Sequence, residues 1–391
     1  MRTVHRIALG STLAACLLAC PAAAQARFDT IYNFADGVGP SSGLALAKGV
    51  LYGTTASSTP QSECGQVFQL NPPTAAGGPW TQTVLYSFPG LPGVADANGC
   101  DPIYAPVMGA DGALYGITYY GGEYGYGVFY QLTPPVSPGS AWTESALYSF
   151  AISPPAPLVR GPNGSFYEPI LPGSFGEGAI LWIQPPACPG AQWTFTTLCS
   201  FPSGSTQGAA YSIVPAPGGL FYGTVETTSG NTGGEVIEIS PPATPGGTCG
   251  ETVLYAFGDS YVNTPNSLIR AGNGTLYGTT VVGSAFQLTP PASTGGAWTY
   301  TQLRTFGYYQ PRAPLLLHHG NLYGTLDEYI GGQTPSGIIF ELKPPTAPGA
   351  EWTLVYLHQF TNGQVPVGPL VMDPGGAIFG ATSSTIYRIV P

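Results

Sequence analysis

The side chains best suited to chemistry in this sequence are tyrosines that lie close to carboxylates in a glycine-rich segment. This segment contains Tyr119, Tyr120, Glu123, Tyr124 and Tyr126. A second group of the same type follows later in the chain, at Tyr308, Tyr309, Asp327, Glu328 and Tyr329. Aromatic rings offer apolar stacking area and their hydroxyl groups form hydrogen bonds, which suits the recognition of sugar rings. The alternative is that these tyrosines pack within the fold.

A second short segment carries spaced oxygen ligands. Asp96, Asn98 and Asp101 stand in the run Asp-Ala-Asn-Gly-Cys-Asp, which resembles the start of a calcium-binding loop. The run lacks the later glutamate that binds calcium through both oxygens, so a solvated turn is the alternative. No cofactor other than calcium is considered.

Hydrolytic machinery has little support. Gly39-Pro40-Ser41-Ser42-Gly43 matches the G-x-S-x-G pattern, but that motif requires a strand, a sharp turn and a helix around the serine. Here it lies in a proline-containing loop. Glu123, Asp101, Asp327 and Glu328 would be the carboxylates of a polysaccharide hydrolase or lyase, yet no motif joins them. We therefore predict no catalytic residue and lean towards a binding protein.

A strand pattern that repeats through the whole chain must position these residues. An element of the type Leu-Tyr-Gly-Thr-Thr occurs seven times, beginning at Leu51, Leu114, Phe166, Phe221, Leu276, Leu322 and Ile378. The copies are 46 to 63 residues apart, a period that is typical of propellers and other repeat arrays. Turn dipeptides such as Asn163-Gly164 and Asn273-Gly274 predict a tight hairpin that leads into each copy.

Each repeat is predicted to contain four short strands, of which the LYG strand is the second. The fourth strand is found six times, at Trp80 to Phe88, Trp142 to Phe150, Trp193 to Phe201, Gly250 to Phe257, Trp298 to Phe306 and Trp352 to Phe360. The seventh copy lies at the front of the chain, from Phe28 to Phe34, and would pair beside Ile386 to Val390. We predict an all-β fold: a seven-bladed β-propeller of four-stranded antiparallel blades, in which strand 28–34 completes the C-terminal blade.

Strand direction then predicts which loops share a face. Loops that join second to third strands and loops that join blades emerge together, because each strand reverses the direction of the chain. Both tyrosine groups are therefore expected on one face.

The cysteines that follow the leader can be sorted in the same way. Cys64 and Cys100 fall on one face of neighbouring units, and we predict that they form a disulfide. Cys188 and Cys249 lie in opposite-face loops of adjacent blades and are a second candidate pair. Cys199 occupies a tyrosine position within a fourth strand and is expected to be a free thiol.

Residues 1–26 have the features of a secretory signal peptide. Arg2 and Arg6 precede an apolar run from Ile7 to Cys20, and small residues end the segment. We expect residues 27–391 to form one propeller domain that is secreted or periplasmic and monomeric. Cys16 and Cys20 each follow a lipobox-like run, so lipoprotein anchoring is the alternative. No later stretch is long and apolar enough to span a bilayer.

The charge balance limits the class of partner. Removal of Arg2 and Arg6 with the leader leaves 8 basic against 20 acidic residues, a formal net charge of −12. Such a surface repels phosphate backbones, so nucleic acid is not expected as a partner. Only 8% of the chain is charged, against about 25% in ordinary globular domains, which fits strands that are buried on both faces.

The strands at Leu51 to Thr55, Val67 to Pro73 and Trp80 to Phe88 together resemble the GloVer repeat of exported bacterial proteins. Phe166-Tyr167-Glu168-Pro169 departs from the pattern because it lacks the glycine, and Cys249 replaces the tryptophan. The resemblance implies a secreted or surface-anchored repeat protein and carries no catalytic residues.

The expected function is that of an exported, non-catalytic propeller that recognises a glycan or a protein through one loop face. The alternatives are the carboxylate-based hydrolase or lyase and a purely structural module of the cell surface.

Overall fold

The computed structural model describes most of the chain after the leader. The described residues are 26–35, 39–56, 64–75, 77–89, 96–137, 139–152, 154, 156–170, 178–188, 191–201, 212–225, 233–258, 264–281, 283–293, 295–307, 309–311, 313–328, 336–347, 349–361 and 363–391. The leader with Cys16 and Cys20, together with Tyr308, Tyr329 and the side chain of Glu328, lies outside this description. No helix in the described part is long and apolar enough to cross a membrane.

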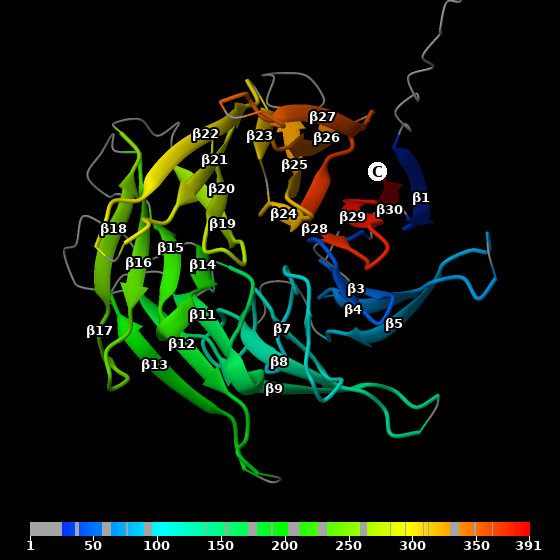
Figure 1. Cartoon of the computed structure of the whole chain (residues 1–391). Coiled ribbons are helices and arrows are strands. Elements are labelled where there is room, and N and C mark those ends of the chain that lie inside the picture. The colour runs from blue at the N-terminus through cyan, green and yellow to red at the C-terminus, as the bar shows by residue number, and fades with distance from the viewer. Residues whose placement is uncertain are drawn as a thin grey trace, which may run out of the picture.

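Seven antiparallel sheets stand around a central axis in the order of the sequence (Figure 1). From the axis outward, blade 1 contains β2 (Ala45–Ala47), β3 (Val50–Thr55), β4 (Gln66–Asn71) and β5 (Thr81–Ser87). Blade 2 contains β6 (Val107–Met108), β7 (Leu114–Ile117), β8 (Val128–Thr133) and β9 (Thr143–Ser149). Blade 3 contains β10 (Val159–Arg160), β11 (Phe166–Ile170), β12 (Ala179–Gln184) and β13 (Thr194–Ser200). Short 3-10 turns η1 (Pro162–Gly164) and η2 (Pro217–Gly219) belong to blades 3 and 4.

The remaining blades repeat this arrangement. Blade 4 contains β14 (Ser212–Pro215), β15 (Phe221–Val225), β16 (Glu235–Ser240) and β18 (Gly250–Ala256), and blade 5 contains β19 (Pro265–Arg270), β20 (Leu276–Thr280), β21 (Ser284–Thr289) and β22 (Thr299–Thr305). Blade 6 contains β24 (Leu316–His318), β25 (Asn321–Glu328), β26 (Gly337–Lys343) and β27 (Thr353–Gln359). Blade 7 contains β28 (Pro366–Met372), β29 (Ile378–Thr382), β30 (Thr385–Val390) and β1 (Arg27–Asn33). The predicted seven-bladed propeller is confirmed.

The N-terminal strand closes the ring. β1 pairs antiparallel with β30, with Phe28 opposite Ile389, and Figure 1 shows β1 beside β30 near the C-terminus. Phe28 stacks on His358 of blade 6 with ring centroids 3.5 Å apart. On the other side, the Tyr32 hydroxyl donates a hydrogen bond of 2.9 Å to Gln82 of blade 1. The split blade therefore joins both of its neighbours.

Glycine in the LYG strand makes room for an aromatic ring on the third strand. Gly53 is paired with Phe68, and a Cβ atom at Gly53 would lie 2.4 Å from the Phe68 ring. Leu51 and Phe68 are fully buried against blade 7, while Tyr52 packs towards blade 2. Each blade thus buries both faces, and each such side chain contributes about 1.5–3 kcal/mol.

Tryptophans at the start of the fourth strands connect neighbouring blades. Trp193 of blade 3 lies 5.3 Å from the Tyr115 ring of blade 2, and Trp298 of blade 5 lies 5.5 Å from Tyr222 of blade 4. Blade 4 has Cys249 where these blades have tryptophan, so this contact cannot form between blades 3 and 4.

A disulfide connects blades 3 and 4 instead. Cys199 is bonded to Cys249, whereas Cys188 is an exposed free cysteine. The predicted pairing of Cys188 with Cys249 and the free thiol at Cys199 were both wrong. The reason is that the loop before Cys249 forms β17 (Gly247–Thr248), which pairs in parallel with β13 at the outer edge of blade 3. This added strand brings Cys249 next to Cys199.

Candidate functional site

The glycine-rich segment after β7 presents four tyrosine side chains to solvent. Tyr119, Tyr120, Tyr124 and Tyr126 are 37%, 38%, 55% and 49% exposed. Among the described residues, only Tyr356 is a further exposed tyrosine. We call residues Tyr119 to Tyr126 the tyrosine loop. Such a concentration of exposed aromatic area in one loop points to a binding surface.

Backbone hydrogen bonds hold the tyrosine loop in place. Tyr120 and Cys100 exchange two bonds of 2.8 and 3.0 Å, and the Gly122 N–H donates to the Asp96 carbonyl at 2.7 Å. The Glu123 N–H donates to the Ser149 hydroxyl at 3.1 Å. Glycines permit this path: a Cβ atom at Gly127 would lie 1.9 Å from the Thr118 carbonyl oxygen. The tyrosines therefore stand on a fixed backbone.

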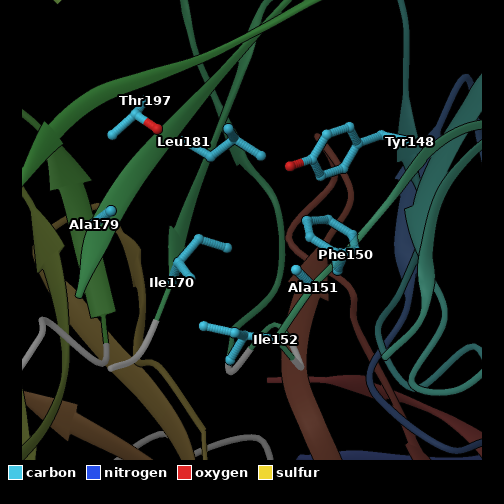
Figure 2. A pocket seen from close by; sticks show the side chains of 8 residues that line it. All are labelled: Tyr148, Phe150, Ala151, Ile152, Ile170, Ala179, Leu181 and Thr197. Atoms are coloured by element: carbon cyan, nitrogen blue, oxygen red, sulfur yellow. The ribbon is translucent and has the colours of Figure 1, made fainter. Parts of the chain in front are cut away.

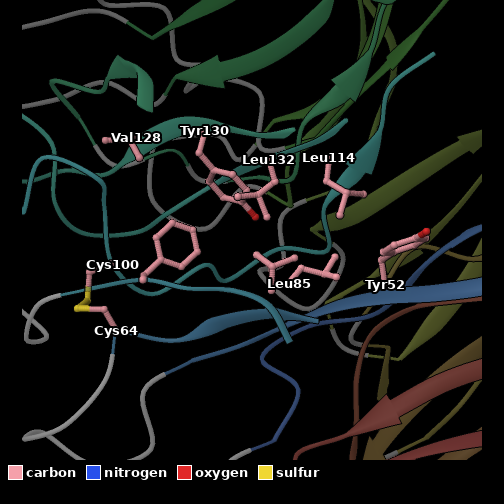
Figure 3. Packing of buried hydrophobic residues seen from close by; sticks show 10 residues of the cluster. Tyr52, Cys64, Leu85, Cys100, Leu114, Val128, Tyr130 and Leu132 are labelled. Atoms are coloured by element: carbon pink, nitrogen blue, oxygen red, sulfur yellow. A yellow bond between two sulfur atoms is a disulfide. The ribbon is translucent and has the colours of Figure 1, made fainter. Parts of the chain in front are cut away.

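The predicted disulfide lies directly behind this loop. Cys64 is bonded to Cys100, and both are fully buried beside Val128 and Tyr130 in the cluster between blades 1 and 2 (Figure 3). The disulfide ties the second-to-third loop of blade 1 to the segment that pairs with Tyr120. It thus braces the loop covalently.

The segment proposed for calcium binding, Asp96 to Asp101, instead supports the tyrosine loop through hydrogen bonds. The Asp96 carboxylate accepts the Asn98 N–H at 2.9 Å, and the Asp101 N–H donates to the Cys64 carbonyl at 2.8 Å. Asp101 has a φ of 56°, which suits a turn. In the described residues, no three His, Cys, Asp or Glu side chains are grouped so that they could hold a metal ion.

Two further tyrosines extend the surface. Burial raises the pKa of Tyr148, and Tyr124 contributes to the shift. Burial also raises the pKa of Tyr104, with smaller contributions from Glu168 and Tyr119. Tyr104 lines the central channel, a cavity of about 520 Å³. Tyr148 thus stands in the outer strand of blade 2, and Tyr104 stands at the axis.

A small groove lies beside Tyr148, between blades 2 and 3. It has a volume of about 140 Å³ and is lined by Phe150, Ile152, Ile170 and Leu181 together with Tyr148. Figure 2 shows the Tyr148 hydroxyl directed towards Leu181 at one side of this groove. An apolar wall next to exposed tyrosines suits the apolar face of a sugar or a side chain.

Glu144 lies in the outer strand of blade 2, and Asp96 lies in the segment that connects blades 1 and 2. Burial raises the pKa of Glu144 to about 7, and Asp96 contributes to the shift. Burial likewise raises the pKa of Tyr86 to about 12, with contributions from Glu144 and Asp96. Glu144 pairs with Leu132 near the β8–β9 turn, at the far end of its strand from the tyrosine loop. Asp96 lies at the base of that loop, where its carbonyl accepts the Gly122 N–H.

The second predicted group lies in another blade. β23 (Tyr309–Pro311) pairs with β25, which places Tyr309 opposite Glu328 and Gln310 opposite Asp327. This is the same face as the tyrosine loop, but it belongs to blade 6, and blades 3 to 5 or blades 7 and 1 lie between them. The carboxylates Asp101 and Glu123 are thus in a different blade from Asp327 and Glu328.

Ser41 has a role within the fold. Its hydroxyl lies 2.9 Å from the Thr54 hydroxyl and donates to the Pro102 carbonyl at 2.9 Å. These contacts connect blade 1 to the segment that enters blade 2, as expected if the G-x-S-x-G match arose by chance.

Sequence reasoning missed Tyr104 and Tyr148. Both occupy ordinary repeat positions: Tyr104 precedes a first strand and Tyr148 lies in a fourth strand. A tyrosine at such a position does not by itself indicate a site residue. Their position next to the most divergent loop in the chain could have identified them.

A scan of protein-family models gives no match to the chain, and neither does a search of curated proteins. The resemblance to the GloVer repeat therefore remains a prediction. Solved structures do match. The fold is that of known β-propellers.

Two of these structures come from B. thetaiotaomicron and are extracellular domains, one of a protein assigned to a hybrid two-component system and one of a protein assigned to a one-component system. They are 13% and 16% identical to this chain, with TM-scores of 0.51 and 0.53, and cover 93% and 92% of it. The chain spans only 41% and 40% of their lengths. YCF48 from Cyanidioschyzon merolae is 11% identical, with a TM-score of 0.54, and the match covers 93% of this chain and 98% of that one.

Proposed function

We propose that this protein is an exported, non-catalytic binding propeller that recognises a neutral glycan through the tyrosine loop and the adjoining tyrosines of blade 2. The observation that carries the proposal is the group of four exposed tyrosines on a backbone fixed by hydrogen bonds and by the Cys64–Cys100 disulfide. A preorganised aromatic surface loses little conformational entropy on binding.

The chemistry of the surface favours sugar over a charged partner. Tyrosine rings cover the apolar face of a pyranose, and their hydroxyls exchange hydrogen bonds with its hydroxyl groups. Glu123, exposed within the loop, and Asp96 at its base supply further acceptors. The net charge of −12 that remains after removal of the leader disfavours polyanions.

Export is supported by two disulfides, which persist in oxidising compartments. The similar folds from B. thetaiotaomicron are extracellular domains, in line with this placement.

The proposal is tested by titration of purified residues 27–391 with a panel of neutral oligosaccharides, followed by calorimetry and by chromatography of the sugar. We expect saturable binding of at least one oligosaccharide without release of shorter products. Product release would overturn the non-catalytic assignment in favour of a hydrolase or lyase. A panel without any binding would overturn glycan recognition and leave a protein partner or a purely structural role.

A further inference from the structure

A further pocket lies on the face opposite the tyrosine loop, between the hairpin turns of blades 2 and 3. Its volume is about 350 Å³, and its lining includes Asp111, Tyr115, Arg160, Asn163 and Trp193. It differs from the central channel in that a carboxylate, a guanidinium and an indole ring line the same space.

The aromatic wall of this pocket is held firmly. The Trp193 ring lies 5.3 Å from Tyr115, 5.6 Å from Phe129 and 6.3 Å from Phe166, measured between ring centroids. Phe166 and Phe129 are buried, whereas Trp193 is half-buried. The indole is thus fixed on one side and open on the other, as a sugar-stacking ring requires.

The Asp111 carboxylate is also fixed in position. One oxygen accepts the Ala113 N–H at 3.1 Å, and the other accepts the Tyr115 hydroxyl at 2.7 Å. The Gln131 amide in turn donates to the Tyr115 hydroxyl at 3.0 Å. Gly109 leaves the space for this arrangement, because a Cβ atom there would lie 2.3 Å from the Asp111 oxygen. The remaining lone pairs of Asp111 can accept hydrogen bonds from a ligand.

Arg160 supplies a positive charge that the fold itself does not use. It is exposed and forms no ion pair with any described carboxylate. Four other blades place an aliphatic residue at the same register position, Leu46, Met108, Leu317 and Met372. Outside the leader, the chain has only 8 basic residues. An unpaired guanidinium at the mouth of a pocket is therefore a candidate anion contact.

We propose that this pocket binds a carboxylated sugar unit, of the uronic acid class. The sugar carboxylate pairs with Arg160, the ring packs on Trp193, and ring hydroxyls donate to Asp111. This site lies on the opposite face from the tyrosine loop, takes a different class of ligand, and does not depend on the proposed function.

Blade 5 offers a matched control. Arg270 pairs with Leu276 as Arg160 pairs with Phe166, and Trp298 lies 5.5 Å from Tyr222 as Trp193 does from Tyr115 at 5.3 Å. Blade 4, however, has Gly218 three residues before its second strand, where blade 2 has Asp111. Arg270→Gln therefore removes the same charge from a place that lacks a counterpart of Asp111 and has Glu238 opposite Tyr222 instead.

The test is titration of residues 27–391 with D-glucuronate, with D-glucose as the uncharged comparison, followed by NMR or calorimetry. We expect saturable glucuronate binding that Arg160→Gln weakens about tenfold or more, since charge-assisted contacts carry such losses. Asp111→Asn weakens it as well, whereas Arg270→Gln and the fourfold alanine variant of the tyrosine loop keep it within about twofold. Glucose binds at least about tenfold more weakly.

Absence of saturable glucuronate binding overturns the proposal, and so does equal binding of glucose. Arg160→Gln that binds like the wild type, or Arg270→Gln that loses as much, also overturns it. Because Arg160 is exposed, the variant is expected to fold, and its circular dichroism spectrum and melting curve verify this in the same samples.

Discussion

Glu168 lies opposite Leu181 in blade 3, at the register position where five other blades pair a glycine with an aromatic residue and blade 4 pairs a glycine with isoleucine. Those pairs are Gly53 with Phe68, Gly116 with Tyr130, Gly223 with Ile237, Gly278 with Phe286, Gly324 with Phe340 and Gly380 with Tyr387. Glu168 is fully buried, and within the described residues its carboxyl oxygens have no hydrogen-bond partner of good geometry. The smaller Leu181 leaves the space that the glutamate side chain fills.

Restoring the pattern of the other blades should stabilise blade 3. Glu168→Gly together with Leu181→Phe removes an unpaired buried carboxyl, which costs about 1–3 kcal/mol, and refills the space with a ring. Leu181→Phe alone collides with Glu168 and destabilises by about 1–3 kcal/mol. Glu168→Gly alone leaves a cavity. Chemical denaturation of all four proteins measures the coupling, and a double variant that equals the sum of the single variants would refute the compensation.

The stability of the wild type should fall as pH rises, relative to that of the double variant. Burial raises the pKa of Glu168 well above its ordinary range, and the Ala156 backbone N–H offsets this only in part. The folded state then keeps a proton that the unfolded state releases above about pH 4.3. Below that pH the protonated Glu168 makes its full contribution to the free energy of unfolding. As the pH rises towards the folded-state pKa, this contribution decreases by about 1.4 kcal/mol per pH unit.

Denaturation at pH 4 and pH 7 checks this sign. The advantage of the double variant should be greater at pH 7. An advantage that is unchanged or smaller at pH 7 would show that Glu168 is not held protonated.

The Cys199–Cys249 disulfide should contribute strongly to stability. It closes a loop over a sequence separation of 50 residues, for which the chain-entropy relation gives about 4 kcal/mol. Replacement of both residues by serine should lower the free energy of unfolding by an amount of this order. Thiol titration of native residues 27–391 should detect Cys188 alone; modification of Cys199 or Cys249 without reductant would contradict the pairing.

Closure of the ring predicts an energetic coupling between Phe28 and His358. Their rings are 3.5 Å apart and 6° from parallel, although 330 residues separate them in the sequence. Alanine at either position should destabilise the fold, and a double-mutant cycle should give a coupling of about 0.5–1.5 kcal/mol. Strictly additive effects would mean that β1 does not join blade 6 in this way.

Much of the architecture could be predicted from the sequence, because its causes are local. The LYG strands, the turns before them and the split blade follow from spacing alone, and Cys64 and Cys100 could be paired from loop positions. The connection between Cys199 and Cys249 could not, since β17 adds to a neighbouring sheet and no local pattern encodes that contact. The departure at Glu168 was visible, whereas its compensation by Leu181 required the register.

The candidate site also has features that the sequence predicts and features that it does not. The tyrosine loop stood out by composition, and its exposure is a property of the folded chain. The contributions of Tyr104 and Tyr148 depend on packing between strands and could not be derived from residue type.

Affinity for a neutral oligosaccharide tests the central claim most directly. Wild-type residues 27–391 are titrated with the strongest binder from the panel, alongside a variant with alanine at Tyr119, Tyr120, Tyr124 and Tyr126 and a control with alanine at Tyr356, which is 51% exposed on the outer strand of blade 6. The tyrosine-loop variant should bind about tenfold or more weakly, and the control within about twofold. A folded tyrosine-loop variant that binds as tightly as the wild type would contradict the account.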